Sequence, residues 1–279
     1  VQWNKRKVAY FGLYKLNVHN GKTVPLTEKI NDVNGWLVDH QGVPRVAMVV
    51  KGLDAKLLYR SKEDEEFRAL WEGGYLDEGI TPLAFDFDNK MMYVASNIGR
   101  DRSAIYRFNP ETNELGDMLF EHDKVDVFGL IMSRTQRKLL GVAYFDDYPQ
   151  WHFFDKTEAE IYESLQAAFP GMTVDIVSTT DDEKLNVLLV SSDRDPGSYY
   201  LYDRETGAAR FLLAPRQWID PEQMSRMEPI SFTARDGLEI PGYLTLPKDR
   251  KLDEAVPLIV NPHGGPFGVR DFWGYNAEH

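Results

Sequence analysis

Alternating apolar and polar positions recur along the chain in three similar segments. Each segment alternates large apolar residues with others, reaches a polar turn and alternates again, which is the pattern of a β-hairpin. The first strands of these hairpins occupy residues 14–17, 106–109 and 200–203. Asn17, Asn109 and Asp203 hold matching positions and are 92 and 94 residues apart. Halving this spacing gives a repeat of about 46 residues and predicts weaker copies near residues 63 and 156.

A second series of polar turns has a similar period. These turns are centred at 47-residue intervals on Gly42, Asn89, Gln136 and Glu183. Each turn precedes an apolar run that predicts a strand, at residues 45–50, 91–96, 139–144 and 185–190. Two interleaved hairpin series give about four strands per repeat, as in a β-propeller blade, whereas a helical solenoid would need a 3.6-residue period.

We therefore predict a mostly β fold, in which residues 1–215 form about four and a half four-stranded blades of an incomplete propeller. Accidental recurrence of hairpins is the alternative. One segment departs from the β pattern, because residues 158–169 place Ile161, Leu165 and Phe169 on one helical face. We interpret this helix as an insertion that packs on a blade; a helix that binds a partner is the alternative.

The repeat ends near residue 215. In residues 216–228, Asp220 followed by Pro221 provides an N-cap and a first helical residue, so this stretch predicts a short linker helix. Residues 229–279 have a different character again. They contain two strands around a turn at Arg235-Asp236-Gly237, and an apolar run at 256–260 that predicts a strand buried on both faces.

A hairpin, a loop, a buried strand and a glycine-rich loop make up the entry to an α/β-hydrolase domain. The motifs here are Ser231-Phe232-Thr233-Ala234-Arg235-Asp236-Gly237, Ile240-Pro241-Gly242-Tyr243-Leu244 and His263-Gly264-Gly265-Pro266. They resemble the junction between propeller and peptidase in the prolyl oligopeptidase family, most closely its acylaminoacyl-peptidase and dipeptidyl-aminopeptidase branch. Residues 229–279 are accordingly predicted to begin the peptidase domain.

The resemblance implies that the backbone N–H of Gly265 is one donor of an oxyanion hole, with His263, Gly264 and Pro266 shaping the loop. An acyl-transfer hydrolase must stabilise an oxyanion, and preorganised N–H groups do so without rearranging. Glycine lets the backbone approach the substrate closely. The alternative is an ordinary glycine-rich turn between a strand and a helix.

The catalytic triad is missing from these 279 residues, which contain no Gly-x-Ser-x-Gly motif. In α/β-hydrolases the serine, the acid and the histidine all follow the His-Gly-Gly loop, so His263 is not the triad base. We therefore expect this chain to be a catalytically inactive part of an enzyme. Its first residues have neither an initiator Met nor a signal peptide, so we expect the native N-terminus to be missing.

Composition removes several function classes. A formal net charge of −12 argues against nucleic acid and anionic membranes as partners, and a 43% hydrophobic content excludes disorder. The chain has no cysteine, which excludes disulfides, thiolate metal sites and a cysteine nucleophile. No apolar run is long enough to span a membrane as a helix. No metal or organic cofactor is implied, and the compartment, cytoplasmic or periplasmic, stays unknown.

A few polar clusters have two interpretations. Asp86-Phe87-Asp88-Asn89 resembles half of a calcium loop but lacks its distal Glu, so a solvated turn is favoured. Arg100-Asp101-Arg102 is interpreted as an ion-pair cluster, with a peptide carboxylate as the alternative partner. The histidines at positions 19, 40, 122 and 152 lack ligand spacing and are interpreted as surface or loop residues.

The predicted function is that of a fragment of a serine peptidase for short peptides. In the family that the chain resembles, the propeller covers the active site and limits access to it. Open propeller edges would also invite pairing between chains, so we expect either self-association or edges that are capped by the terminal segments. The alternative is a non-catalytic propeller that acts as a binding or scaffold module.

Overall fold

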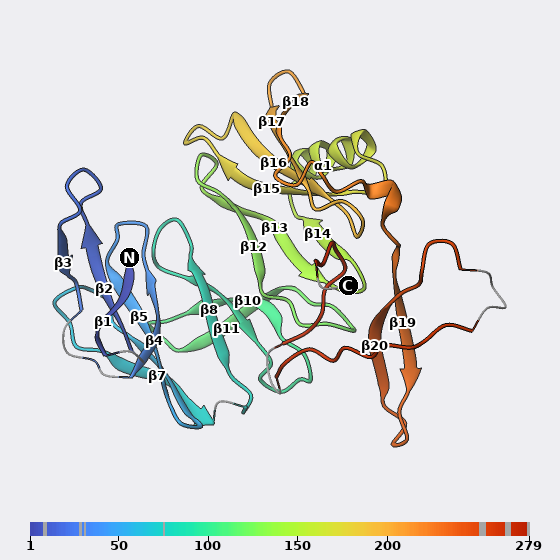
Figure 1. Cartoon of the computed structure of the whole chain (residues 1–279). Coiled ribbons are helices and arrows are strands. Elements are labelled where there is room, and N and C mark those ends of the chain that lie inside the picture. Colours follow the sequence, from blue (N-terminus) through green and yellow to red (C-terminus); the bar gives the residue numbers. More distant parts are fainter. Residues whose placement is uncertain are drawn as a thin grey trace. The chain divides into compact units, whose positions relative to one another are not determined.

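The structure is a computed structural model of the 279-residue chain, and it describes residues 1–7, 10–27, 30, 32–74, 76–250, 255–265 and 269–277 (Figure 1). The chain divides into two compact units. The first comprises residues 1–132 and 137–144, and the second comprises residues 133–136 and 145–279. Among the described residues, no helix combines the length and the apolar character needed to cross a membrane.

The first unit begins with a three-stranded sheet and continues with two four-stranded sheets. The first sheet contains β1 (Gln2–Lys7), β2 (Tyr10–Leu16) and β3 (Thr23–Pro25). The second contains β4 (Val33–Val38), β5 (Pro44–Lys51), β6 (Asp54–Tyr59) and β7 (Arg68–Gly74). The third contains β8 (Ile80–Phe85), β9 (Met92–Ser96), β10 (Ala104–Asn109) and β11 (Glu114–Phe120). Both four-stranded sheets follow chain order, as in propeller blades.

Two further sheets follow in the chain. The first is three-stranded, with β12 (Gly129–Ser133), β13 (Lys138–Phe145) and β14 (Pro149–Phe153). The second is four-stranded, with β15 (Thr173–Thr179), β16 (Leu185–Ser191), β17 (Ser198–Asp203) and β18 (Ala208–Leu213). These successive antiparallel sheets, several of them four-stranded, confirm the predicted mostly β, propeller-like fold class.

The predicted helix is confirmed as α1 (Lys156–Ala168). Its N-cap Asp155 accepts a hydrogen bond from the N–H of Glu158, which satisfies one free donor of the first turn. Leu165 packs on Val174 and Leu188 in the core of the second unit. The helix follows β14 at the position where the four-stranded sheets have their fourth strand. Of the hairpin predicted near residue 156, only the first strand, β14, is therefore present. The copy near residue 63 is complete, as β6 and β7.

Short polar side chains explain where the second strand begins in four of the sheets, namely at β5, β9, β13 and β16. Four residues at 47-residue intervals precede these strands and accept backbone N–H groups of their own turns: Asp39, Asp86, Ser133 and Thr180. Such side-chain acceptors favour turns over continued strand. Within each turn one residue has a positive φ: Gly42, Asn89, Arg137 and Glu183. The predicted turns are therefore confirmed, with Arg137 in place of its neighbour Gln136.

The core of the first unit lies between its two four-stranded sheets. Val46 and Tyr59 from one sheet meet Phe85, Met92 and Phe108 from the other, and all five side chains are essentially inaccessible to solvent. Burial of such side chains contributes roughly 1.5–3 kcal/mol each. The alternating residues of the predicted strands thus form a core between blades.

Beyond β18 the chain contains little regular structure. The predicted linker helix is shorter than expected and consists of one 3₁₀ turn, η1 (Pro221–Gln223), with Asp220 as its N-cap. The following residue, Met224, is already extended, and the N–H of Met227 donates to Asp193 at 2.7 Å where the next strand begins. The predicted hairpin is present as β19 (Met227–Thr233) and β20 (Glu239–Thr245).

The strand predicted at residues 256–260 is wrong for this structure. This run has no regular secondary structure, and Leu258, Ile259 and Val260 are 79%, 88% and 75% exposed. No strand among the described residues pairs with this run. Its backbone therefore makes no inter-strand hydrogen bonds, and its apolar side chains have no surface to pack against. An apolar run becomes a buried strand only where neighbouring strands are present.

Candidate functional site

The predicted oxyanion loop lies open to solvent. His263, Gly264 and Gly265 are all exposed and have no regular secondary structure, whereas Pro266 lies outside the described residues. The Nδ1 atom of His263 is 2.6 Å from the carbonyl oxygen of Gly264, so the tautomer that carries Nδ1–H donates to it. A Cβ added at Gly264 would meet no atom within 4 Å. Backbone groups of this loop are thus accessible to a ligand.

The chain is attached to the second unit on both sides of this loop. Before it, the hydroxyl of Tyr243 on β20 donates to the carbonyl of Asp147 at 2.7 Å. After it, the indole N–H of Trp273 donates to the carbonyl of Met227 at 2.9 Å. The loop is therefore a span between two fixed points of the same unit.

The chemistry that this loop can supply is hydrogen-bond donation from its backbone. Its only titratable side chain is His263, whose Nδ1 atom the structure places beside a backbone carbonyl. In the described part of the chain, no three His, Asp or Glu side chains are grouped so as to hold a metal ion.

Arg100, the candidate partner for a peptide carboxylate, is already paired. Its guanidinium lies 2.5 Å from the carboxylate of Glu121 and donates to the hydroxyl of Tyr106 at 3.2 Å. Arg102 pairs with Asp101 next to it. The ion-pair interpretation of this cluster is confirmed.

A buried polar network in the first unit was missed from the sequence. The guanidinium of Arg45 lies 3.3 Å from Asp39 and donates to the hydroxyl of Tyr59 at 2.6 Å. That hydroxyl donates in turn to Glu111 at 2.7 Å. Burial raises the pKa of Tyr59, and the hydrogen bond from Ser61 leads the effects that lower the pKa of Glu111. The only sequence signal is an arginine at the start of an apolar strand.

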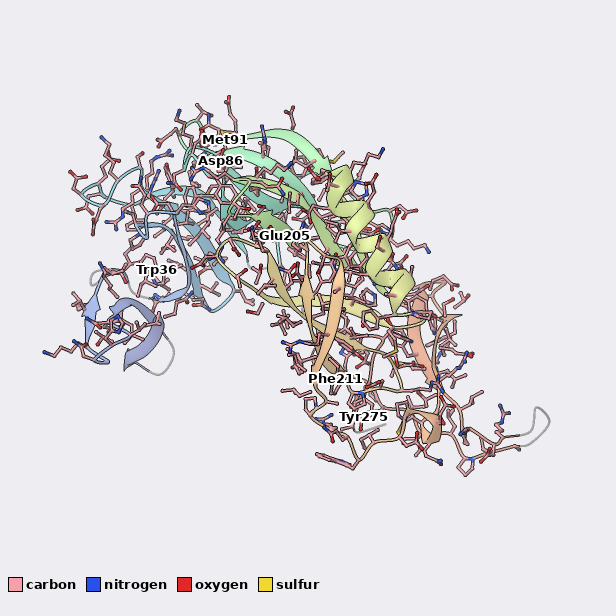
Figure 2. All side chains as sticks on the ribbon, turned by 90° about the horizontal axis from the view of Figure 1, so that it is seen from above. Trp36, Asp86, Met91, Glu205, Phe211 and Tyr275 are labelled. Carbon is pink, nitrogen blue, oxygen red and sulfur yellow. The ribbon has the colours of Figure 1, made fainter. Side chains whose placement is uncertain are left out.

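The half calcium loop is a hydrogen-bonded turn. Asp86 and Met91 lie close together at this turn (Figure 2), and the carboxylate of Asp86 accepts the N–H groups of Lys90 and Met91 at 3.2 and 3.3 Å. Burial, followed by the hydrogen bond and negative charge of Asp88, raises the pKa of Asp86 to about 6. The two carboxyl groups therefore interact with one another, and backbone N–H groups of the same turn donate hydrogen bonds to both.

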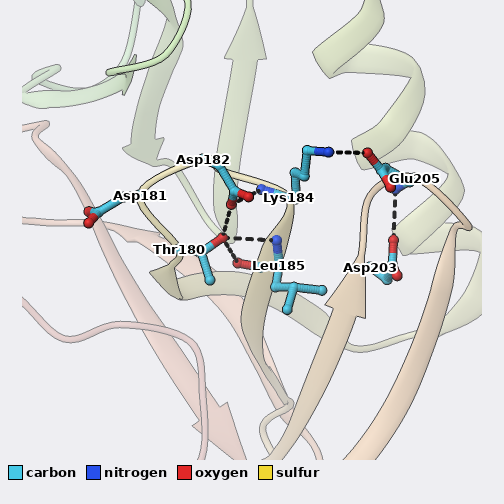
Figure 3. Close-up of a pocket in the computed structure, with 7 residues that line it drawn as sticks. All are labelled: Thr180, Asp181, Asp182, Lys184, Leu185, Asp203 and Glu205. Atoms are coloured by element: carbon cyan, nitrogen blue, oxygen red, sulfur yellow. Dashed lines mark hydrogen bonds and ion pairs between the residues drawn. The ribbon is translucent and has the colours of Figure 1, made fainter.

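A hollow of about 490 Å³, lined mostly by polar residues, lies between the β15–β16 and β17–β18 turns (Figure 3). Thr180, Asp182 and Lys184 line one side, and Asp203 and Glu205 line the other. Lys184 and Glu205 form an ion pair across it at 2.5 Å, and Asp182 accepts from Thr180 at 2.6 Å. These polar groups are paired with one another, so the contacts within and between the two turns account for the hollow.

Comparisons with known proteins support the resemblance. No protein-family model matches the chain. The chain is 24% identical over 284 aligned residues to a dipeptidyl aminopeptidase BIII from Pseudoxanthomonas mexicana, covering 99% of this chain and 41% of that protein. It is 25% identical to a dipeptidyl peptidase family member 6 from Caenorhabditis elegans, covering 81% of this chain and 34% of that protein. The chain thus spans less than half the length of either relative.

Solved structures show the same fold. A structure from a study of two prolyl endopeptidases matches with a TM-score of 0.64 at 15% identity, covering 97% of this chain and 40% of that one. A puromycin hydrolase matches with a TM-score of 0.56 at 19% identity, covering 86% and 37%. The predicted resemblance is confirmed: the chain is similar in sequence to a dipeptidyl aminopeptidase, and its fold is similar to those of a prolyl endopeptidase and a puromycin hydrolase.

Proposed function

We propose that the intact protein is a serine peptidase that hydrolyses short peptides, of the dipeptidyl- or acylaminoacyl-peptidase type. The observation that carries this proposal is the exposed His263–Gly265 loop, which follows the β19–β20 hairpin in a chain similar along its length to a dipeptidyl aminopeptidase. The proposed division is residues 1–215 for propeller blades, 216–228 for the linker and 229–279 for the start of the peptidase domain.

In this proposal Gly265 donates its backbone N–H to the oxyanion of the tetrahedral intermediate. The N–H is fixed before the reaction and strengthens its hydrogen bond as charge develops, so it lowers the barrier by about 2.7–4 kcal/mol. His263 and Pro266 hold the shape of the loop, while Gly264 leaves space for the substrate. The nucleophile, acid and base lie outside these 279 residues, so the chain alone has no hydrolase activity.

The propeller limits access to the active site in this proposal, so short peptides are the preferred substrates. Full-length protein is expected to release p-nitroaniline from dipeptidyl or N-acylaminoacyl p-nitroanilides faster than from a long peptide that ends in the same residues and the same p-nitroanilide. It is also expected to react stoichiometrically with a fluorophosphonate probe, which labels activated serines. The 279-residue chain is the matched control and remains unlabelled. Labelling of that chain would overturn its proposed inactivity, and an unlabelled full-length protein would overturn the proposed activity.

The isolated chain has one further property in this proposal, which is pairing with a second copy through β18. This strand lies at the edge of its sheet, and all six of its residues are exposed, including Phe211 at 52% and Leu213 at 49%. Exposed apolar edge strands favour intermolecular pairing. Sedimentation of the chain should show a dimer or larger species that Phe211→Lys weakens; a monomer at all concentrations would contradict the proposal.

A further inference from the structure

The segment Phe145–Tyr148, between β13 and β14, presents three successive backbone carbonyls to the C-terminal part of the chain. The carbonyl of Phe145 accepts from Nη1 of Arg270 at 3.1 Å, and that of Asp146 accepts from Nη2 of Arg270 at 2.9 Å. The next carbonyl, that of Asp147, accepts from the hydroxyl of Tyr243 at 2.7 Å. Donors about 100 residues or more away in sequence thus occupy every acceptor in this row.

Aromatic contacts reinforce these hydrogen bonds at both ends of the segment. The ring of Phe272 meets that of Phe145 edge to face, with centroids 4.6 Å apart. The ring of Trp273 meets that of Tyr148 at 5.4 Å, also edge to face. The guanidinium of Arg270 additionally lies over Phe272 at 5.2 Å. Such pairs add specific geometry to the apolar contact.

Arginine has the shape that this contact requires. A guanidinium presents parallel N–H groups that reach two acceptors at once, which a lysine ammonium does not reproduce. Arg270 is five residues after Gly265, so at most about 17–18 Å of extended chain separates the anchor from the loop. The anchor therefore limits how far the loop can move away from the Phe145–Tyr148 segment.

We infer that Arg270 is a positioning residue, which anchors the chain after the His263–Gly265 loop to the Phe145–Tyr148 segment and thereby fixes the loop for catalysis. This inference rests on the proposed function, because it assigns the anchor to the oxyanion loop of that peptidase. A misplacement of about 1 Å can reduce a rate about 100-fold, so release of the anchor acts mainly on kcat.

The test uses full-length protein with Arg270→Met and Arg270→Lys, with Arg210→Met on β18 as the matched control. Hydrogen exchange is followed in peptides that cover residues 143–150 and 269–277, and kcat and KM are measured with a dipeptidyl p-nitroanilide. Arg270→Met is expected to reduce kcat about 10-fold with KM within about 2-fold, and to raise exchange in both peptides. Arg270→Lys is expected to show smaller changes than Arg270→Met in both kcat and hydrogen exchange, because lysine keeps the charge but not the paired N–H groups. Arg210→Met is expected to change neither kcat nor the exchange of the two peptides.

Other outcomes separate the inference from the proposed function. Unchanged exchange overturns the anchor, even if kcat falls, since Arg270 would then act on the substrate itself. Faster exchange with unchanged kcat overturns the positioning role. Absence of peptidase activity in the wild-type protein refutes the proposed function and, with it, any catalytic positioning; the exchange data then decide whether the anchor itself exists.

Discussion

Two apolar runs of similar sequence have opposite fates in this molecule. Residues 46–50 form the middle of β5, where Val46 is completely buried between two sheets. Residues 256–260 have a similar apolar content, yet Ile259 is 88% exposed and the run has no regular structure. The difference lies in the neighbours: β4 and β6 pair with β5, whereas no described strand pairs with the second run. The local pattern predicts that a run is able to form a strand, and the neighbouring strands decide whether that strand forms.

The largest effect should come from placing a charge in each run of the 279-residue chain. Val46→Asp puts a carboxylate in the core and is expected to reduce the free energy of unfolding by at least about 4 kcal/mol. Ile259→Asp changes it by less than about 0.5 kcal/mol, because the side chain is already in water. Urea unfolding followed by circular dichroism measures both. Equal losses would show that residues 256–260 are buried after all.

Much of the fold was predictable because its determinants are local. The turns around Gly42, Asn89 and Glu183 and the strands after them follow from short-range pattern, and α1 follows from its cap and its apolar face. The network around Arg45 was not predictable as a whole: Tyr59 lies on the neighbouring strand of the same sheet, but Glu111, which accepts from Tyr59, joins only when the second four-stranded sheet packs against the first.

The candidate site divides in the same way. The His263–Gly265 motif is recognisable in sequence, but no sequence pattern shows that Arg270 reaches the carbonyls of Phe145 and Asp146. The expected strand at 256–260 failed because its prediction assumed neighbours that the described structure does not contain.

A second comparison tests the blade that has a helix in place of its fourth strand. Glu158 of α1, whose side chain is 7% exposed, pairs with Arg204 from the β17–β18 turn. Arg204→Met would leave a buried carboxylate without its cation and is expected to cost about 3 kcal/mol of unfolding free energy. Lys184→Met removes the solvent-exposed pair with Glu205 and should leave the unfolding midpoint unchanged. Similar midpoints for the two variants would show that α1 is only loosely held.

Asn89 in the first unit and Glu183 in the second occupy corresponding turn positions, but only Glu183 can carry a charge. Their contributions to the free energy of unfolding should therefore differ in pH dependence. Asn89 accepts the N–H of His40 at 2.9 Å, and Glu183 accepts the N–H of Arg134 at 2.6 Å. Burial alone would raise the pKa of Glu183, but hydrogen bonds from Ser133 and Thr135 outweigh it and lower the pKa.

A depressed carboxyl pKa stabilises the fold above the unfolded value of about 4.3 and loses that effect as pH falls through the folded value. Glu183→Gln should therefore cost about 1 kcal/mol at pH 7, after allowance for partial exposure, and less at pH 3. Asn89→Ala should show a loss that does not change with pH. Unfolding curves at several pH values test the pair, and a pH-independent loss for Glu183→Gln would contradict the assignment.

Asp86 should show the smallest effect, with the opposite sign. Its pKa is raised to about 6, so the folded state favours the protonated form, and this contribution disappears as pH rises through about 6. Asp86→Asn removes the repulsion from Asp88 and should raise stability at pH 8 by about 0.5 kcal/mol, after allowance for solvent screening. The gain should vanish below about pH 4, where the carboxyl is protonated in both states. A gain at pH 3 equal to that at pH 8 would refute this account of the turn.

The most direct test of the proposed catalytic role is the kcat of full-length protein with Gly265→Val. This substitution keeps the backbone N–H, but its branched side chain prevents the substrate carbonyl from reaching that N–H, so the donor is lost to the reaction. The account predicts near-normal folding, shown by an unchanged unfolding midpoint, together with a fall in kcat of about 100-fold or more, the scale of one lost oxyanion donor. A folded variant that keeps near-wild-type kcat would contradict the account, and the His263–Gly265 loop would then be a structural turn.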